Sequence, residues 1–145
     1  MYEIQAVIGD KKVIQLEKLI GTRIVTLPQD KVMIPFSEKF KIAKEIPDLP
    51  FTYSGAITLH SSIADFCRMV SVQGKIAYIE AFFFGGQGTQ ACSLWDSGLM
   101  REEPRVGLQS INIALRFLGV TKEGSSDEFD IMGLGNFRKI ENWLS

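Results

Sequence analysis

The sequence predicts an α+β fold in which three to four helices pack on a mainly antiparallel sheet with a central hairpin. The hairpin begins with the apolar run at 76–84, which is rich in the β-branched and aromatic residues typical of a buried strand. Glycines follow at 85, 86 and 88, and residues 91–95 form the return strand. Strands and helices do not alternate strictly, and several reversals are tight, which favours an antiparallel sheet over a doubly wound parallel one.

Length and charge indicate one soluble domain spanning residues 1–145. A chain of 145 residues, 46% of them hydrophobic, can bury about two-thirds of its unfolded surface. Lysine plus arginine number 16 against 17 acids, a net charge of −1, which argues against a nucleic-acid-binding protein. There is no signal-peptide pattern, and no apolar stretch approaches the roughly 20 residues that cross a bilayer. We therefore expect a cytoplasmic protein with neither a nucleic-acid nor a membrane partner.

Local patterns place elements on either side of the hairpin. Before it we expect a strand at 2–8 ended by Gly9, a helix at 11–20 capped by Asp10, strands at 23–27 and 31–35, a helix from Ser37 to about Glu45, and a helix at 59–70 capped by Ser61 or Ser62. After it we expect a turn at 96–98, a short stretch at the sheet edge at 99–101, a helix at 108–118 and a last helical turn within 129–145. The helix at 108–118 has the clearest pattern, an apolar stripe formed by Leu108, Ile111, Leu115 and Leu118.

The glycine-rich loop is the first candidate site. Backbone amides of Gly85, Gly86, Gln87 and Gly88 could cradle a phosphate, as glycine-rich loops do at helix N-termini. The P-loop pattern, however, needs Gly-Lys-Ser/Thr followed by a helix, and a strand follows here. A tight turn between core strands is the simpler interpretation.

Glu80 is the most informative single residue. By alternation it shares a strand face with Tyr78 and other aromatic residues, where a buried charge is costly unless it is paired or hydrogen-bonded. Two interpretations follow. Either the face is partly solvated, as an interface, or Glu80 holds the loop through Gln87, Gln90 or backbone amides, and we favour this structural role.

The residues typical of nucleophilic or metal chemistry are sparse. His60 is the single histidine, and Cys67 lies seven residues further on, roughly 10 Å along one helix. Cys67 and Cys92 suit core positions with free thiols. One histidine and two distant cysteines match no zinc spacing, and the acids at 127–130 do not follow the calcium-loop pattern. We predict no catalytic residue, no metal site and no cofactor.

Acidic residues cluster in two loops that flank the helix at 108–118. They are Glu102, Glu103, Asp127, Glu128 and Asp130. An ordinary solvated surface would show the same pattern. The functional interpretation is a surface that meets a basic protein partner, because complementary charge speeds encounter and sets register.

Three stretches carry a resemblance: YIEAFFFGGQGTQACSLW at 78–95, INIALRFLGV at 111–120 and DEFD at 127–130. They resemble a family of small, stand-alone bacterial proteins. That family is associated with immunity proteins of contact-dependent and polymorphic toxin systems. The resemblance covers mainly residues 76–130 and supplies no catalytic residue. It implies a cytoplasmic protein that binds a cognate toxin domain and blocks it.

Three functions therefore remain from the sequence. The first is an immunity protein that neutralises a toxin domain, a nuclease being one such toxin, by covering its active or substrate-binding surface. The alternative is a small hydrolase or ligand-binding domain that uses the loop at 85–90, with Glu80, Gln87 and Cys92 as its candidates. The third is a regulatory or scaffold domain with a homodimer interface on the aromatic face.

Overall fold

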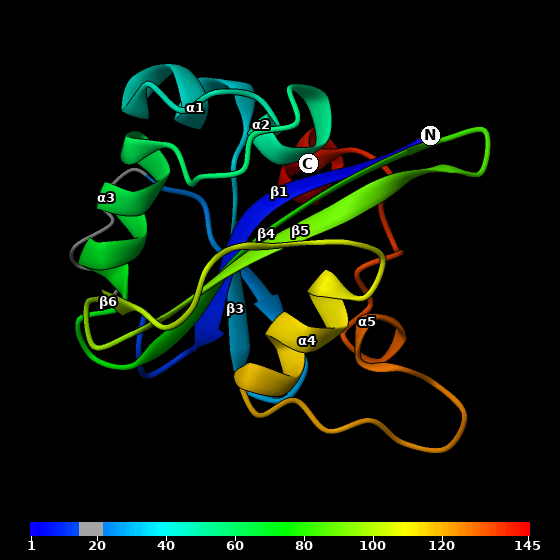
Figure 1. The fold of residues 1–145 in the computed structure, drawn as a ribbon. Helices are drawn as coiled ribbons and strands as arrows, with labels where there is room; N and C mark the ends of the chain where they lie inside the picture. The colour runs from blue at the N-terminus through cyan, green and yellow to red at the C-terminus, as the bar shows by residue number, and fades with distance from the viewer. Residues whose placement is uncertain (15–21) are drawn as a thin grey trace.

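One antiparallel sheet organises the molecule (Figure 1). The computed structural model describes residues 1–14 and 22–145. In this part of the chain the strands are β1 (Tyr2–Asp10), β2 (Val25–Leu27), β3 (Lys31–Pro35), β4 (Lys75–Phe84), β5 (Gln87–Asp96), β6 (Leu99–Met100) and β7 (Arg105–Val106). They lie in the order β2-β3-β1-β4-β5-β6, and β7 also pairs with β5. Every pairing is antiparallel, which confirms the predicted α+β class.

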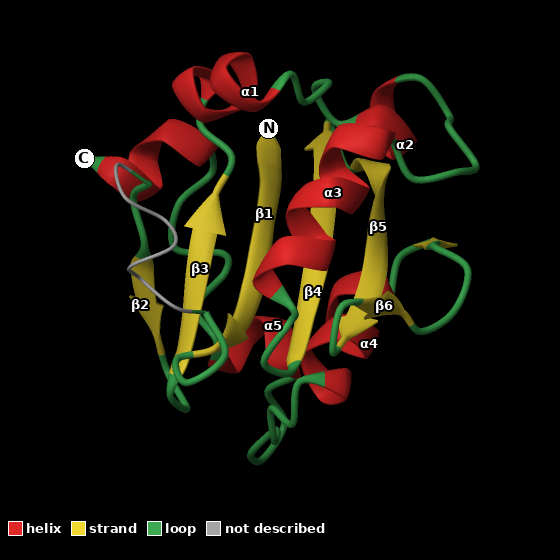
Figure 2. Ribbon diagram, turned by 90° about the vertical axis from the view of Figure 1, so that its left-hand side faces the viewer, coloured by secondary structure: helices red, strands yellow, loops and turns green. Residues whose placement is uncertain are grey.

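Helices cover both faces of the sheet. They are α1 (Glu38–Lys44), α2 (Pro50–Tyr53), α3 (Ser61–Val70), α4 (Ser110–Phe117), α5 (Glu128–Ile131) and the 3₁₀-helix η2 (Ile140–Leu144). Figure 2 shows α3 in front of the sheet and α4 and α5 behind it. The sheet is therefore the middle of three layers.

Strand alternation divides the core into two clusters. On β4, Ala77 and Ile79 belong to the cluster that includes α4, whereas Ile76 and Tyr78 belong to the cluster under α3. Successive side chains of a strand point to opposite faces, so a strand buried on both sides is apolar throughout. The aromatic face of β4 is thus covered by helices along most of its length.

The central hairpin is confirmed. β4 and β5 pair from Lys75↔Asp96 to Phe84↔Gln87, so Gly85 and Gly86 form a two-residue turn. Their φ angles are 61° and 78°, the left-handed values that such a turn needs at both positions and that favour glycine. The closed end of the hairpin extends past the helical layers (Figure 1).

The predicted N-terminal boundaries need correction. β1 does not end at Gly9 but continues to Asp10, because Gly9 pairs with Val32 and Ile76. Residues 11–14 form a turn and a bend rather than a helix, with the Lys12 amide donating to Asp10 Oδ1 at 2.8 Å. The rest of the helix expected at 11–20 falls on 15–21, outside the described residues.

The helix predicted at 59–70 is present as α3, and its apolar stripe is buried as expected. Its cap differs from the prediction. His60, rather than Ser61 or Ser62, is the N-cap, and its Nδ1 accepts from the Ser62 amide at 3.1 Å. The single histidine thus has a local structural role.

Candidate functional site

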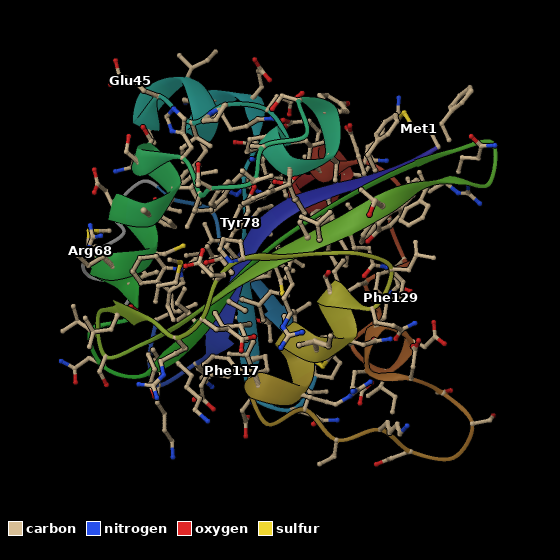
Figure 3. All side chains as sticks on the ribbon, in the orientation of Figure 1. Met1, Glu45, Arg68, Tyr78, Phe117 and Phe129 are labelled. Carbon is tan, nitrogen blue, oxygen red and sulfur yellow. The ribbon has the colours of Figure 1, made fainter. Side chains whose placement is uncertain are left out.

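Glu80 is fully buried at the centre of a polar network on the α3 side of the sheet. Its carboxylate accepts hydrogen bonds from the Thr52 amide at 2.9 Å, the Phe51 amide at 3.3 Å and the Tyr78 hydroxyl at 2.8 Å. Tyr78 itself lies in the interior (Figure 3). Glu80 therefore holds α2 against the sheet through the backbone amides of Phe51 and Thr52, and the prediction that it holds the glycine-rich loop is wrong.

Gln5 extends this network along β1. Its side-chain amide nitrogen donates to Pro47 O and to the Tyr78 hydroxyl, both at 3.0 Å, while its oxygen accepts from the Leu49 amide at 3.3 Å. The Tyr78 hydroxyl oxygen accepts a hydrogen bond from the Gln5 amide, and its own O–H donates to Glu80 Oε1. Together the three side chains satisfy the polar backbone groups of residues 47–52 beneath an otherwise apolar layer.

Burial raises the pKa of the Glu80 carboxyl, and the bonds from Thr52, Tyr78 and Phe51 offset part of that rise. Burial also holds the Tyr78 hydroxyl protonated by raising its pKa well above the usual range. Within the described part of the chain Glu80 forms no ion pair. The arrangement anchors α2 on the sheet, and the Glu80 side chain itself is shielded from solvent.

The residues proposed for a hydrolase do not converge. Glu80 pairs with Ala91 on the α3 face, whereas Cys92 belongs to the core cluster on the α4 face. Burial raises the pKa of Cys92 to about 12, so its thiol is protonated near neutral pH and is a poor nucleophile. Gln87, Gly85 and the rest of the turn are exposed. This geometry does not assemble the alternative active site.

Gly88 has a steric requirement of its own. A Cβ added at this position would lie 1.9 Å from Phe82 O and 2.7 Å from Phe83 Cα, both backbone atoms of the neighbouring strand. Only glycine fits there without moving β4. The predicted loop-structural role of Gly85, Gly86 and Gly88 therefore agrees with the geometry.

The acids at 127–130 belong to the start of α5 and are largely engaged in structure. Asp127 is the N-cap, accepting from the Asp130 amide at 2.9 Å, and this bond lowers its pKa. Glu128 is buried and accepts from Arg116 Nε at 2.9 Å, so it does not present a carboxylate to solvent. Asp130 is exposed. Of this predicted group, Asp130 has the freest access to a partner.

Glu102 and Glu103 lie in a different setting, on the connection between β6 and β7. We call residues 99–108 the edge segment. Its backbone covers the outer edge of β5: the Arg101 amide donates to Leu94 O and the Gly107 amide to Gln90 O, both at 2.8 Å. Covering an edge strand in this way prevents indiscriminate strand pairing.

The edge segment is unusually apolar for an exposed element. Leu99, Met100, Val106 and Leu108 are 66%, 40%, 53% and 60% exposed. Isolated exposed apolar residues are ordinary, but four within ten positions along one edge of the sheet make this edge a candidate interaction surface. The backbone hydrogen bonds to Leu94 and Gln90 hold the main chain of this segment at the sheet edge.

A cleft of about 290 Å³ lies between α3 and the edge segment. Its lining is mainly apolar and consists of Thr58, Leu59, Ala64, Arg68, Trp95, Gly98, Leu99, Met100, Glu103 and Pro104. Glu103, a predicted partner-binding residue, is thus at the rim of the cleft. Figure 3 shows Arg68 on the outer side of α3.

The sequence patterns did not reveal this cleft. Its walls come from α3 and from a segment about thirty residues later, and no local signal joins the two. One available signal was misread, because Leu108 was included in the helical stripe. The helix begins at Ser110, and Leu108 lies outside it.

Further chemistry is not indicated in the residues described. Residues 1–14 and 22–145 contain no group of three or more histidine, cysteine, aspartate or glutamate side chains arranged to hold a metal ion. The helices in those ranges include none with the length and apolarity to cross a membrane. No family model, curated protein or solved structure matches this chain.

Proposed function

We propose that the protein is an immunity protein, which binds a cognate bacterial toxin domain and neutralises it by covering its active or substrate-binding surface. The observation that supports this proposal most directly is the edge segment, where four exposed apolar side chains stand on a backbone fixed to β5. Protein interfaces are enriched in aromatic and methionine side chains at their centre and have a polar rim. In the edge segment, Leu99 and Met100 supply exposed apolar side chains, and the charged residues 101–103 follow them directly.

The edge segment carries two arginines, Arg101 and Arg105, and two glutamates, and of these glutamates only Glu103 is left without an ion-pair partner in the described residues to meet a basic partner surface such as that of a nuclease. Glu103 is exposed, and it forms no salt bridge with any residue in the described ranges. A carboxylate at the rim of an apolar patch would guide a basic partner and set its register. The resemblance of residues 76–130 to toxin-immunity proteins supplies the class of partner.

A paired substitution tests the proposal. A toxin domain taken from the reading frames that neighbour this gene would be co-expressed with the wild-type chain, with Leu108→Asp and with Ile42→Asp, and both growth and the dissociation constant would be measured. Ile42 is a matched control, because it is 70% exposed but lies on α1. Placing a carboxylate among the exposed apolar side chains of the edge segment should weaken binding at least about 30-fold, the loss expected for a hot-spot residue.

The control variant should bind and protect as the wild type does. If no complex forms with the wild-type chain, the immunity function is wrong. If Leu108→Asp binds as tightly as Ile42→Asp, the edge segment is not the interface.

A further inference from the structure

Residues 47–53, which we call the strap, carry α2 and are attached to the sheet through side chains. Within the described residues, the hydrogen bonds that join the strap to the sheet all use Gln5 or Glu80. The backbone–backbone bonds of the strap in those ranges are local, such as the bond from the Tyr53 amide to Leu49 O at 2.8 Å. The strap can therefore detach without breaking the backbone pairing of the sheet, as sub-global openings of folded proteins do.

The strap contains a strained backbone position. Leu49, the N-cap of α2, has φ 41° and ψ 59°, in the left-handed region that bulky side chains rarely adopt. Pro50 follows it, and a residue before proline favours extended backbone. Such a conformation persists only where its surroundings hold it, and Gln5 holds this one by accepting from the Leu49 amide at 3.3 Å. Opening of the strap would release the strain.

The carboxylate that holds the strap also favours its opening. Glu80 is fully buried and forms no ion pair with residues 1–14 and 22–145. A buried carboxylate without a cation is costly, and burial accordingly raises the pKa of Glu80. An open strap would return this carboxylate to water. The closed strap is still the favoured state, because opening exposes the buried side chains of Leu49 and Phe51.

One other ionisable group near the strap has to be separated from Glu80. On β5, Ala91 lies opposite Glu80 and does not titrate. The ionisable groups that face this region from the other elements are Tyr78 of β4, Cys67 of α3, Tyr53 and Asp48 of the strap, Lys41 of α1 and Glu3 of β1. Burial raises the pKa of both tyrosines and of the thiol, so these three groups stay neutral near pH 7. Asp48 pairs with Lys41. Burial and the charge of Asp48 raise the pKa of Glu3, which therefore needs a control.

We propose that the strap opens as a unit while the sheet stays folded, and that ionisation of Glu80 favours the open state. In the open state the carboxyl has its ordinary pKa of 4.5, whereas burial raises this pKa in the closed state. The closed strap therefore binds the proton more tightly. The open fraction increases, by up to about tenfold per pH unit, as pH rises from 4.5 through the closed-state pKa. This device goes beyond the proposed function, because the strap does not include the edge segment.

Amide hydrogen exchange of the ¹⁵N-labelled chain between pH 4.5 and 8 tests the proposal. The protection factor of the Thr52 amide, which donates to Glu80 Oε2 at 2.9 Å, would be compared with that of Ile79, which is fully buried in β4. We expect Thr52 to be at least about tenfold less protected than Ile79, because local opening needs less free energy than global unfolding. Equal protection of the two amides would mean that the strap opens only with the whole chain, and would overturn the proposal.

Two variants assign the pH dependence to its source. In the wild type the protection of Thr52 should fall as pH rises, and in Glu80→Gln it should not change with pH. Glu3→Gln is the matched control, because the pKa of Glu3 is also raised by burial, and it should keep the wild-type dependence. If Thr52 protection falls equally with pH in the wild type and in Glu80→Gln, or if Glu3→Gln removes the fall, the role of Glu80 is wrong.

Tyr78→Phe tests the same point without removing the carboxylate. The hydrogen bond from the Tyr78 hydroxyl lowers the pKa of Glu80, so its loss should raise that pKa. The fall in Thr52 protection should then extend to higher pH than in the wild type. A fall that ends at the same pH in both chains would overturn the assignment to Glu80, even if Glu80→Gln is too unstable to measure.

Discussion

Replacing Glu80 with glutamine keeps the shape of the side chain but changes what it can accept. One carboxylate oxygen accepts from the Phe51 amide and the Tyr78 hydroxyl, and the other accepts from the Thr52 amide. An amide has only one oxygen, so in either orientation its NH₂ group faces at least one donor. Tyr78 cannot relieve this by reversing, because Gln5 already donates to its oxygen.

The expected loss of stability follows from that count. A buried donor left without an acceptor costs about 1–3 kcal/mol, and at least one is created by the substitution. Removing a buried charge offsets part of this cost, because the carboxylate has no ion pair within the described residues. We therefore expect Glu80→Gln to lower the free energy of unfolding by about 1–2 kcal/mol at pH 7.

Urea denaturation at pH 7, followed by circular dichroism, measures this difference. Glu123→Gln is a suitable control, because Glu123 is exposed and its side chain makes no hydrogen bond with the residues described. The control should unfold at the urea concentration of the wild type. A Glu80→Gln variant as stable as the control would refute the claim that this carboxylate anchors α2.

The pH dependence of the same difference has a defined sign. Burial raises the pKa of folded Glu80 above its ordinary value of 4.5, so between those two values the folded chain binds more protons than the unfolded chain. The contribution of Glu80 to stability is therefore fully present below pH 4.5 and decreases as pH rises through the folded pKa. The stability difference between the wild type and Glu80→Gln should be larger at pH 4.5 than at pH 8. A difference that grows with pH would mean that the hydrogen bonds outweigh burial.

Two other substitutions test local packing. Gly88→Ala should disrupt pairing at the closed end of the hairpin and lower the free energy of unfolding by about 1–3 kcal/mol, because its Cβ would lie 1.9 Å from Phe82 O. Gly135→Ala is the control, since its Cβ would meet nothing nearer than 3.5 Å. Equal stability of the two variants in thermal unfolding would contradict this account. Asn112→Ala should cost about 2 kcal/mol, because the side chain donates to Asp127 Oδ2 at 3.1 Å and accepts from the Phe129 amide at 2.9 Å. Faster hydrogen exchange at the Phe129 amide would confirm that Asn112 docks α5 on α4, and unchanged exchange would argue against it.

Local sequence signals predicted the centre of the fold. Residues close together in sequence are enough to specify the hairpin. They are the apolar run of β4, the glycines at 85 and 86 with left-handed φ angles, and the return strand β5. Alternation also placed Glu80 correctly on the face of Tyr78. Its partners in α2, however, come from 28 and 29 residues earlier, and only the fold brings them together.

The candidate site was harder to predict because distant residues define it. The start of α4 depends on Gln90, whose side-chain oxygen accepts from the Ile111 amide at 3.0 Å and whose backbone oxygen accepts from the Gly107 amide. This contact from β5 ends the edge segment and leaves Leu108 in solvent rather than in the helical stripe. Likewise, the acidic group at 127–130 looked uniform in sequence, but Arg116 pairs with Glu128 and removes it from the surface.

Hydrogen exchange of the wild-type chain with and without the cognate toxin domain tests the binding surface most directly. The proposed function predicts slower exchange in residues 99–108 and at the cleft-facing end of α3 when the toxin is present, with no change in α1. Protection confined to the hairpin turn at 85–88, or to α5, would contradict the assignment of the edge segment as the interface.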